Sequence, residues 1–236
     1  MIPVNEPWLQ EEDLTSLVDC FRSGWISSAG PQLEQFENDW ARYCGVRHGI
    51  AVSNGTTALQ VAVEAVGVGP GDEVIMPSFT IISCASAVVR AGGTPVLVDC
   101  DPVTFCLDPQ QVEARVTSRT KAIMVVHMYG HPVDMDRIDA IARKHDLKVI
   151  EDAAEVHGAE YLSGRGTLGE TWRRCGGMGH IATFSFFANK LITTGEGGMV
   201  VTDDEALAKR SRSLRNLCFQ SSRRFLHYEH GHQFRM

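Results

Sequence analysis

Short apolar runs alternate with longer segments of helical spacing along most of the chain. The runs, rich in β-branched residues, predict strands, and apolar residues spaced three and four positions apart predict helices. Strands are predicted at residues 49–53, 73–76, 94–98, 121–127, 148–150, 182–186 and 199–202. Helices are predicted at residues 11–21, 32–43, 56–66, 81–90, 134–145 and 204–214.

The order of these elements predicts an α/β fold. Strands that alternate with helices are joined by crossover connections, so the sheet should be mostly parallel, with helices on both faces. The segment 121–127 is apolar almost throughout, as expected for a strand buried on both faces. We therefore expect a three-layer α/β/α sandwich, whose ligand lies beyond the carboxyl ends of the strands.

Composition narrows the class of protein. The 236 residues carry 22 Lys and Arg against 29 Asp and Glu, and this net charge of −7 argues against nucleic acid or an anionic membrane as partner. The seven cysteines include no CxxC pair, which favours reduced thiols over disulfides or a metal site. The acidic N-terminus is unlike a signal peptide, and no apolar run could cross a bilayer. We expect a cytoplasmic protein without a metal.

The first candidate site lies in the string Ser-Asn-Gly-Thr-Thr at 53–57, between a predicted strand and a predicted helix. Gly55 lets the backbone approach an anion, and the amides of the first helical turn point at it. The hydroxyl of Thr56 can add a donor. Ser, Asn and Thr also favour an ordinary helix N-cap, so this stretch alone favours a cap over a phosphate site.

Two further candidates follow later strands. Asp152 comes after the strand at 148–150, where a carboxylate can pair with a buried cation; a solvated loop acid is the plain alternative. Lys190 ends the string Thr-Phe-Ser-Phe-Phe-Ala-Asn-Lys, where desolvation would lower its pKa and favour imine chemistry. Ser185 in the same string can donate to a phosphate. The alternative here is a hairpin with an incidental lysine.

A possible phosphate-binding turn, a carboxylate and a lysine thus follow one another along the chain, each after a predicted strand. In this order the sequence resembles the nucleotide-sugar aminotransferases of the DegT/StrS group. The resemblance covers essentially the whole chain. It is carried by Ile2-Pro3-Val4, Trp25-Ile26-Ser27-Ser28, and the segments 53–59, 69–77, 151–155 and 184–201. It implies a mixed seven-stranded sheet in the large domain of a pyridoxal phosphate (PLP) enzyme, at residues 31–236 after an N-terminal segment 1–30. It also implies a homodimer with active sites at the subunit interface.

The resemblance implies a role for each matching residue of the reaction centre. Lys190 matches the lysine that holds PLP as a Schiff base and then moves protons between donor and sugar. Asp152 matches the acid that pairs with the pyridine nitrogen. Glu155 falls where a Gln, His or Glu lies near the edge of the ring.

The remaining cofactor contacts are implied in the same way. Gly55, Thr56 and Ser185 match phosphate contacts, whereas Gln233 stands where the neighbouring subunit usually supplies an asparagine. The family usually stacks an aromatic side chain on the ring, but Ile81 aligns with that position. The stacking is therefore expected to be weaker, or to come from Phe79.

The implied reaction moves an amino group from L-glutamate to a nucleotide-linked 4-keto-6-deoxy sugar. Related PLP-dependent sugar dehydratases replace the lysine by histidine, so Lys190 favours transamination over that alternative. Relatives continue past the arginine that matches Arg235 into a small C-terminal domain, which we expect to be missing here. An inactive remnant or a regulatory partner that keeps the fold is therefore a second alternative.

One segment departs from the family in length. Residues 163–179 look longer than usual and carry Trp172, Arg173 and Arg174. Such arginines could touch a nucleotide diphosphate. An exposed basic loop is the plainer interpretation.

Overall fold

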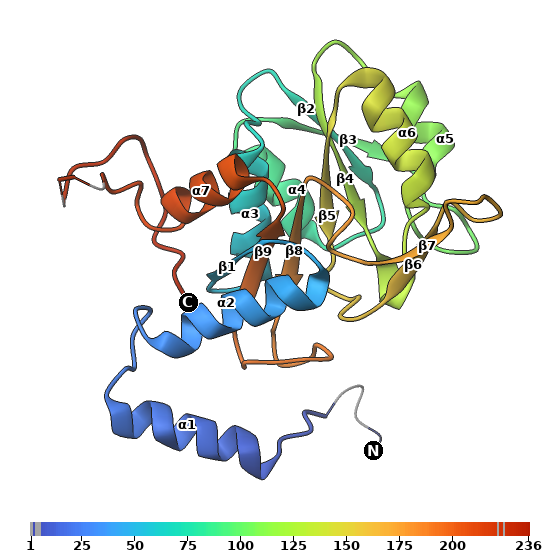
Figure 1. Cartoon of the computed structure of the whole chain (residues 1–236). Helices are drawn as coiled ribbons and strands as arrows, with labels where there is room; N and C mark the ends of the chain where they lie inside the picture. The colour runs from blue at the N-terminus through green and yellow to red at the C-terminus, as the bar shows by residue number, and fades with distance from the viewer. Residues whose placement is uncertain (1, 3–5, 221, 224) are drawn as a thin grey trace.

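A seven-stranded sheet forms the centre of the computed structural model, which describes residues 2, 6–220, 222–223 and 225–236 (Figure 1). Residues 3 and 4 of the N-terminal family string lie outside the described residues. The strands are β1 (His48–Val52), β2 (Glu73–Pro77), β3 (Thr94–Val98), β4 (Thr120–Val126), β5 (Lys148–Asp152), β8 (Ile181–Ser185) and β9 (Gly198–Thr202).

The strand order is β1-β9-β8-β5-β4-β2-β3. All neighbours from β8 to β3 are parallel, whereas β9 is antiparallel to both β1 and β8. The expectation of a mixed, mostly parallel seven-stranded sheet is confirmed.

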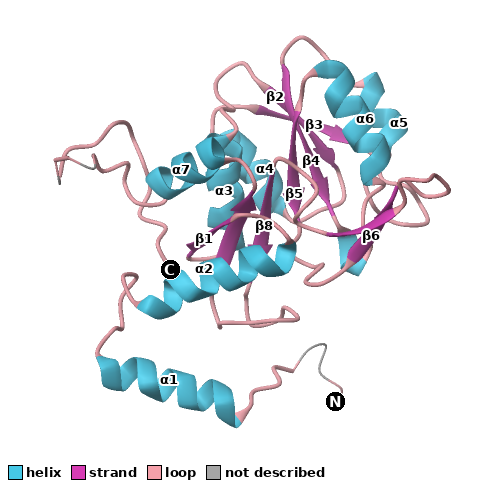
Figure 2. Ribbon diagram, viewed as in Figure 1, coloured by secondary structure: helices cyan, strands magenta, loops and turns pink. Residues whose placement is uncertain are grey.

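Helices cover both faces of this sheet (Figure 2). One face carries α3 (Gly55–Ala65), α4 (Ile82–Arg90) and α7 (Glu205–Leu214), in which α3 contacts the other two. The other face carries α2 (Pro31–Cys44), α5 (Pro109–Ala114) and α6 (Met135–His145). The crossover from β2 to β3 runs in the opposite direction to that from β4 to β5, so right-handed connections place α4 and α6 on opposite faces. The result is the expected three-layer sandwich.

Strands β2, β8 and β9 are buried along their whole length because helices cover both faces of the sheet. Helix starts and ends carry the residues that favour them. Pro31 opens α2, and Gly45 closes it in the left-handed region at a φ of 76°. Asp204 caps α7 by accepting hydrogen bonds from the amides of Ala206 and Leu207.

Two features differ from the sequence-based expectation. The short helix α5 was not expected, and the segment 163–179, interpreted as a basic loop, contains β7 (Thr171–Arg174), which forms a hairpin with β6 (Glu160–Ser163). The Arg174 guanidinium lies 4.0 Å from the centroid of the Tyr43 ring and donates to the Tyr43 carbonyl at 2.6 Å. Arg173 donates to the Gly177 carbonyl at 3.1 Å. These arginines lie in a strand, are partly buried and donate to the protein's own backbone, so the interpretation as an exposed basic loop is wrong for them.

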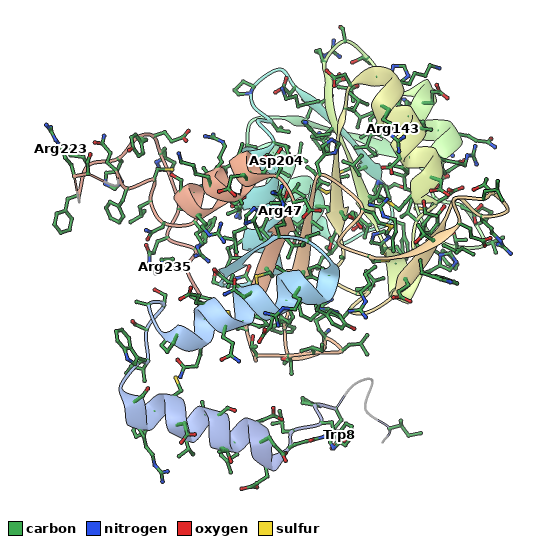
Figure 3. All side chains as sticks on the ribbon, viewed as in Figure 1. Trp8, Arg47, Arg143, Asp204, Arg223 and Arg235 are labelled. Carbon is green, nitrogen blue, oxygen red and sulfur yellow. The ribbon has the colours of Figure 1, made fainter. Side chains whose placement is uncertain are left out.

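The helix α1 (Glu11–Ser23) stands apart from the sandwich in Figure 1, and none of its residues is buried. The C-terminal residues lie near the connection from α1 to α2, where the Arg235 guanidinium donates to the Ser28 carbonyl at 2.7 Å (Figure 3). Among the described helices, none combines the length and apolarity that a membrane span requires. The division into segments 1–30 and 31–236 stays a prediction.

Candidate active site

A cavity of about 650 Å³ opens at the carboxyl ends of β1, β5 and β8. This is the edge where open α/β sheets bind their ligands. Six of the seven residues proposed as site residues line it, namely Gly55, Thr56, Asp152, Glu155, Ser185 and Lys190. The seventh, Gln233, is exposed and is not among the lining residues. Its backbone pairs with Asn216 in an isolated antiparallel β-bridge. Its expected partner is the cavity of a neighbouring subunit.

The start of α3 forms one wall of the cavity. Asn54 caps the helix by accepting a hydrogen bond from the Thr57 amide at 2.9 Å. The amides of Gly55 and Thr56, in the same turn, have no acceptor within the helix, and the helix dipole adds positive character there. The two interpretations of this stretch are therefore compatible, because the helix is capped and still offers two amides to an anion.

The close approach of Ser185 requires a glycine at position 55. A Cβ added at Gly55 would lie 2.8 Å from the Cβ of Ser185 and 3.2 Å from its Oγ. The close approach places the Ser185 hydroxyl beside the first turn of α3. The Thr56 hydroxyl lies on the same turn, 2.9 Å from the Ser83 hydroxyl. Two amides and nearby hydroxyls make a set of donors that fits a phosphate.

Asp152 is the last residue of β5, one position inside the strand instead of beyond it as expected. It is buried, and its oxygens accept hydrogen bonds from the Ala154 amide at 3.1 Å and the Cys84 thiol at 3.2 Å. Burial raises the pKa of this carboxyl, against the opposing effects of those hydrogen bonds and the charge of Lys190. Both hydrogen-bond donors are neutral. A protonated ring nitrogen would therefore supply the counter-charge that this carboxylate needs.

Lys190 lies in the loop that follows β8, and its side chain is only 17% exposed. Its Nζ is 3.7 Å from Oε1 of Glu155, and the other Glu155 oxygen accepts a hydrogen bond from the Tyr129 amide at 3.0 Å. The carboxylate is thus fixed to the backbone and holds the amine at the cavity wall. This pairing was not expected from the sequence.

Ile81 aligns with the position at which the family resemblance implies a stacking aromatic residue. Ile81 lines the cavity, whereas Phe79 is not among the lining residues. The Phe79 ring instead packs 5.9 Å from Phe105 and 6.2 Å from Tyr129, between ring centroids. The suggestion that Phe79 replaces the stacking ring gains no support from this geometry.

His157 is a supporting residue that the sequence did not single out for a role. Its Nε2 donates to the Ser185 carbonyl at 2.9 Å, and its ring packs 5.7 Å from Trp40 and 5.5 Å from Phe184. Burial lowers the pKa of His157 to about 4. The neutral imidazole therefore holds the end of β8 in place.

None of the seven cysteines, which all lie in the described part of the chain, forms a disulfide. Within the described parts of the chain, no three His, Cys, Asp or Glu side chains come together as a metal site would require. The set of phosphate donors, buried carboxylate and half-enclosed amine fits PLP, whose phosphate, ring nitrogen and aldehyde each find a matching group.

Comparison with known proteins supports this fit. The DegT/DnrJ/EryC1/StrS aminotransferase family matches residues 7–236. The chain is 50% identical over 235 residues to GDP-perosamine synthase of Caulobacter vibrioides, covering 100% of this chain and 61% of that protein. It is 42% identical to GDP-perosamine synthase of Escherichia coli O157:H7, covering 100% of this chain and 62% of that protein. The chain thus spans about three fifths of the length of these relatives.

Solved structures of related proteins also resemble this chain closely. The chain superimposes on 3-amino-5-hydroxybenzoic acid synthase with a TM-score of 0.89 and 37% identity, covering 100% of this chain and 60% of that one. It superimposes on S. venezuelae DesV, solved in complex with a ketimine intermediate, with a TM-score of 0.82 and 40% identity, covering 98% and 62%. The chain therefore belongs to the DegT/DnrJ/EryC1/StrS aminotransferase family, whose members are PLP-dependent enzymes.

Proposed function

We propose that this chain is the cofactor-binding part of a sugar aminotransferase that moves an amino group from L-glutamate to a nucleotide-linked 4-keto-6-deoxy sugar. One observation carries the proposal: the amine of Lys190, the carboxylate of Asp152 and the phosphate donors line a single cavity. When bound, PLP supplies an electron sink for the carbon atom that carries the transferred amine.

Each residue has a task that its position suits. The amides of Gly55 and Thr56 and the Ser185 hydroxyl bind the phosphate and fix the cofactor's position. Asp152 keeps the ring nitrogen protonated, because an ionised carboxylate that is buried favours a cation beside it. Lys190 would hold the cofactor covalently and, once released, would take a proton from one carbon atom and deliver it to another.

The relatives support a sugar nucleotide as the amino acceptor. Two of them are named GDP-perosamine synthases. A third, 45% identical over 208 residues, is named dTDP-3-amino-3,4,6-trideoxy-alpha-D-glucose transaminase, from Streptomyces venezuelae. We favour a GDP-linked sugar, because the relative that is 50% identical carries that name. A dehydratase role is disfavoured by the lysine at position 190.

We further propose that the working unit is a homodimer. Gln233 is exposed and lies outside its own cavity, so it is free to reach the phosphate of a neighbouring subunit. In this arrangement residues 31–236 form the large domain of each subunit.

The cofactor part of the proposal is tested by loading purified protein with PLP, reducing it with borohydride and mapping the modified residue by mass spectrometry. One cofactor is expected on Lys190, and none on that site in Lys190→Ala. Lys209→Ala, which removes an exposed lysine of α7, is the matched control and should load as the wild type does. Protein that takes up no cofactor would instead support the inactive remnant.

The reaction is tested with the loaded protein, L-glutamate and a panel of GDP-, UDP- and dTDP-linked 4-keto-6-deoxy sugars. An amino sugar and 2-oxoglutarate should form together, and fastest with the GDP-linked sugar. A dehydrated sugar formed without glutamate would replace the proposal by the dehydratase alternative.

A further inference from the structure

A buried thiol lies against the carboxylate at the back of the cavity. Cys84, in the first turn of α4, is fully buried, and its Sγ is 3.2 Å from Oδ2 of Asp152. The Thr80 hydroxyl lies 3.3 Å from the same sulfur. The sulfur thus contacts both a hydroxyl and a carboxylate that are far apart in the sequence.

The direction of these hydrogen bonds follows from burial. Desolvation, and next the negative charge of Asp152, raise the pKa of the Cys84 thiol well above its ordinary value. The thiol therefore keeps its proton and donates it to the carboxylate, and the sulfur is free to accept from Thr80. The second carboxylate oxygen accepts from the Ala154 amide. Two donors from different elements thus fix the plane of the carboxylate.

This contact is distinct among the thiols of the protein. Within the described chain, the thiols of Cys20, Cys106 and Cys218 donate instead to backbone carbonyls. A buried cysteine in a helix is ordinarily a small apolar core residue. A donor role accounts for a sulfur held at hydrogen-bond distance from Asp152, a buried carboxylate that lines the cavity.

We propose that Cys84 is a positioning residue for Asp152: its S–H bond orients the carboxylate toward the cavity and stabilises its ionised form for the cofactor's ring nitrogen. The inference rests on the role proposed above for Asp152. A thiol is a weak donor, so it orients the carboxylate while leaving most of its negative charge for the ligand.

Two substitutions separate this role from simple packing. Cys84→Ser keeps a donor in a slightly smaller side chain, whereas Cys84→Val fills the space and removes the donor. A packing role predicts that valine is tolerated better than serine. The positioning role predicts the reverse order.

The first measurement is the equilibrium affinity for PLP. Loss of one hydrogen bond to a charged group weakens binding by about tenfold, so Cys84→Val should bind PLP roughly 3- to 30-fold more weakly. Cys84→Ser should stay within about threefold of the wild type. Cys106→Val, at a buried thiol that binds a carbonyl, is the control and should bind as the wild type does.

The second measurement is the pH dependence of that affinity. Without its donor, the Asp152 anion is less stable, so the acid limb of the PLP affinity profile should move to higher pH in Cys84→Val. A residue that only fills space would leave this limb in place. The free energy of unfolding of each variant, measured without PLP, shows whether the apoprotein is intact.

A double-mutant cycle with Asp152→Asn closes the test. Cys84→Val should have no further effect on PLP affinity in the Asp152→Asn background, because the thiol acts through that carboxylate. Equal affinities of wild type and Cys84→Val, or equal losses in both backgrounds, would overturn the proposal. If Asp152→Asn alone leaves PLP binding unchanged, the role assigned to Asp152 fails instead, which is a separate outcome.

Discussion

His127 and Glu151, both fully buried, share a hydrogen bond of 3.0 Å between Nε2 and Oε2. On the other side of the ring, the Val133 amide donates to Nδ1 at 3.0 Å. The hydrogen-bond network therefore assigns the proton to Nε2, and a neutral imidazole donates to an ionised carboxylate. The same carboxylate accepts from the amides of Gly176 and Met178, each at 2.8 Å. This pair connects the end of β4 and β5 to the loop before β8. Glu151 directly precedes Asp152 in the chain, so the pair also supports the position of Asp152.

Removal of this carboxylate should destabilise the protein strongly. Glu151→Ala leaves a buried histidine and several backbone amides without an acceptor, which costs about 3 to 5 kcal/mol. The cost should appear in the free energy of unfolding in urea. Glu205→Ala, at a side chain that is 76% exposed, is the matched control and should change it by less than about 0.5 kcal/mol. Equal effects of the two substitutions would contradict the structural role of the pair.

Gly55→Ala tests the phosphate cradle. The new methyl group would meet Ser185 at 2.8 Å and force the start of α3 away from β8. Crowding of this kind costs about 1 to 3 kcal/mol of stability, and PLP affinity should fall by about tenfold or more. Gly69→Ala, where nothing lies within 4 Å of the added carbon, should leave both quantities nearly unchanged. The measurements are urea unfolding and PLP titration, and unchanged PLP affinity in Gly55→Ala would count against the cradle.

His157 should make stability depend on pH. Its pKa is about 4 in the folded protein against an ordinary value of 6.5, so the folded state favours the neutral ring. This contribution is fully present above pH 6.5 and is lost as the pH falls toward 4, at most about 3 kcal/mol. His157→Phe keeps a ring beside Trp40 and cannot titrate. Its free energy of unfolding should fall less over that interval, and parallel pH profiles would refute the assignment.

The proposed dimer can be tested by mixing two defective variants. Lys190→Ala cannot hold PLP covalently, and Gln233→Ala should weaken loading by one charge-assisted hydrogen bond, about tenfold. If Gln233 serves the neighbouring subunit, a hybrid dimer has one site with both native residues. Random assortment should then restore about a quarter of the sites to wild-type affinity. No recovery after subunit exchange would place Gln233 outside the partner's site.

The architecture could be predicted from the sequence, because the spacing of apolar residues indicates which side of each strand or helix is buried. The apolar run at 121–127 and the strand–helix alternation predicted the parallel sheet, and residues that follow parallel strands necessarily meet at one edge. That is why Gly55, Asp152 and Ser185 could be named as neighbours in advance. The hairpin at β6 and β7 was missed because its strands are short and its arginines resemble surface charges.

Contacts that depend on the direction of a side chain could not be predicted from the sequence. Cys84 and Asp152 are 68 residues apart, and a cysteine on the inner side of a helix looks like ordinary core. The Glu155–Lys190 pair likewise needs the turn after β8, which periodicity does not define. In each case the partner is fixed by tertiary packing, while the local pattern is compatible with many partners.

Strand β9 lies between β1 and β8 in the sheet, although it follows both of them in the sequence. Gly198 pairs with both Val52 and Ser185, and a side chain there would collide with the Asn54 carbonyl oxygen. The two walls of the cradle, 185 − 55 = 130 residues apart, are therefore held together by a strand made after both of them. We therefore expect a growing polypeptide on the ribosome to bind the coenzyme only after this strand has emerged, because the cradle depends on late, non-local steps of folding.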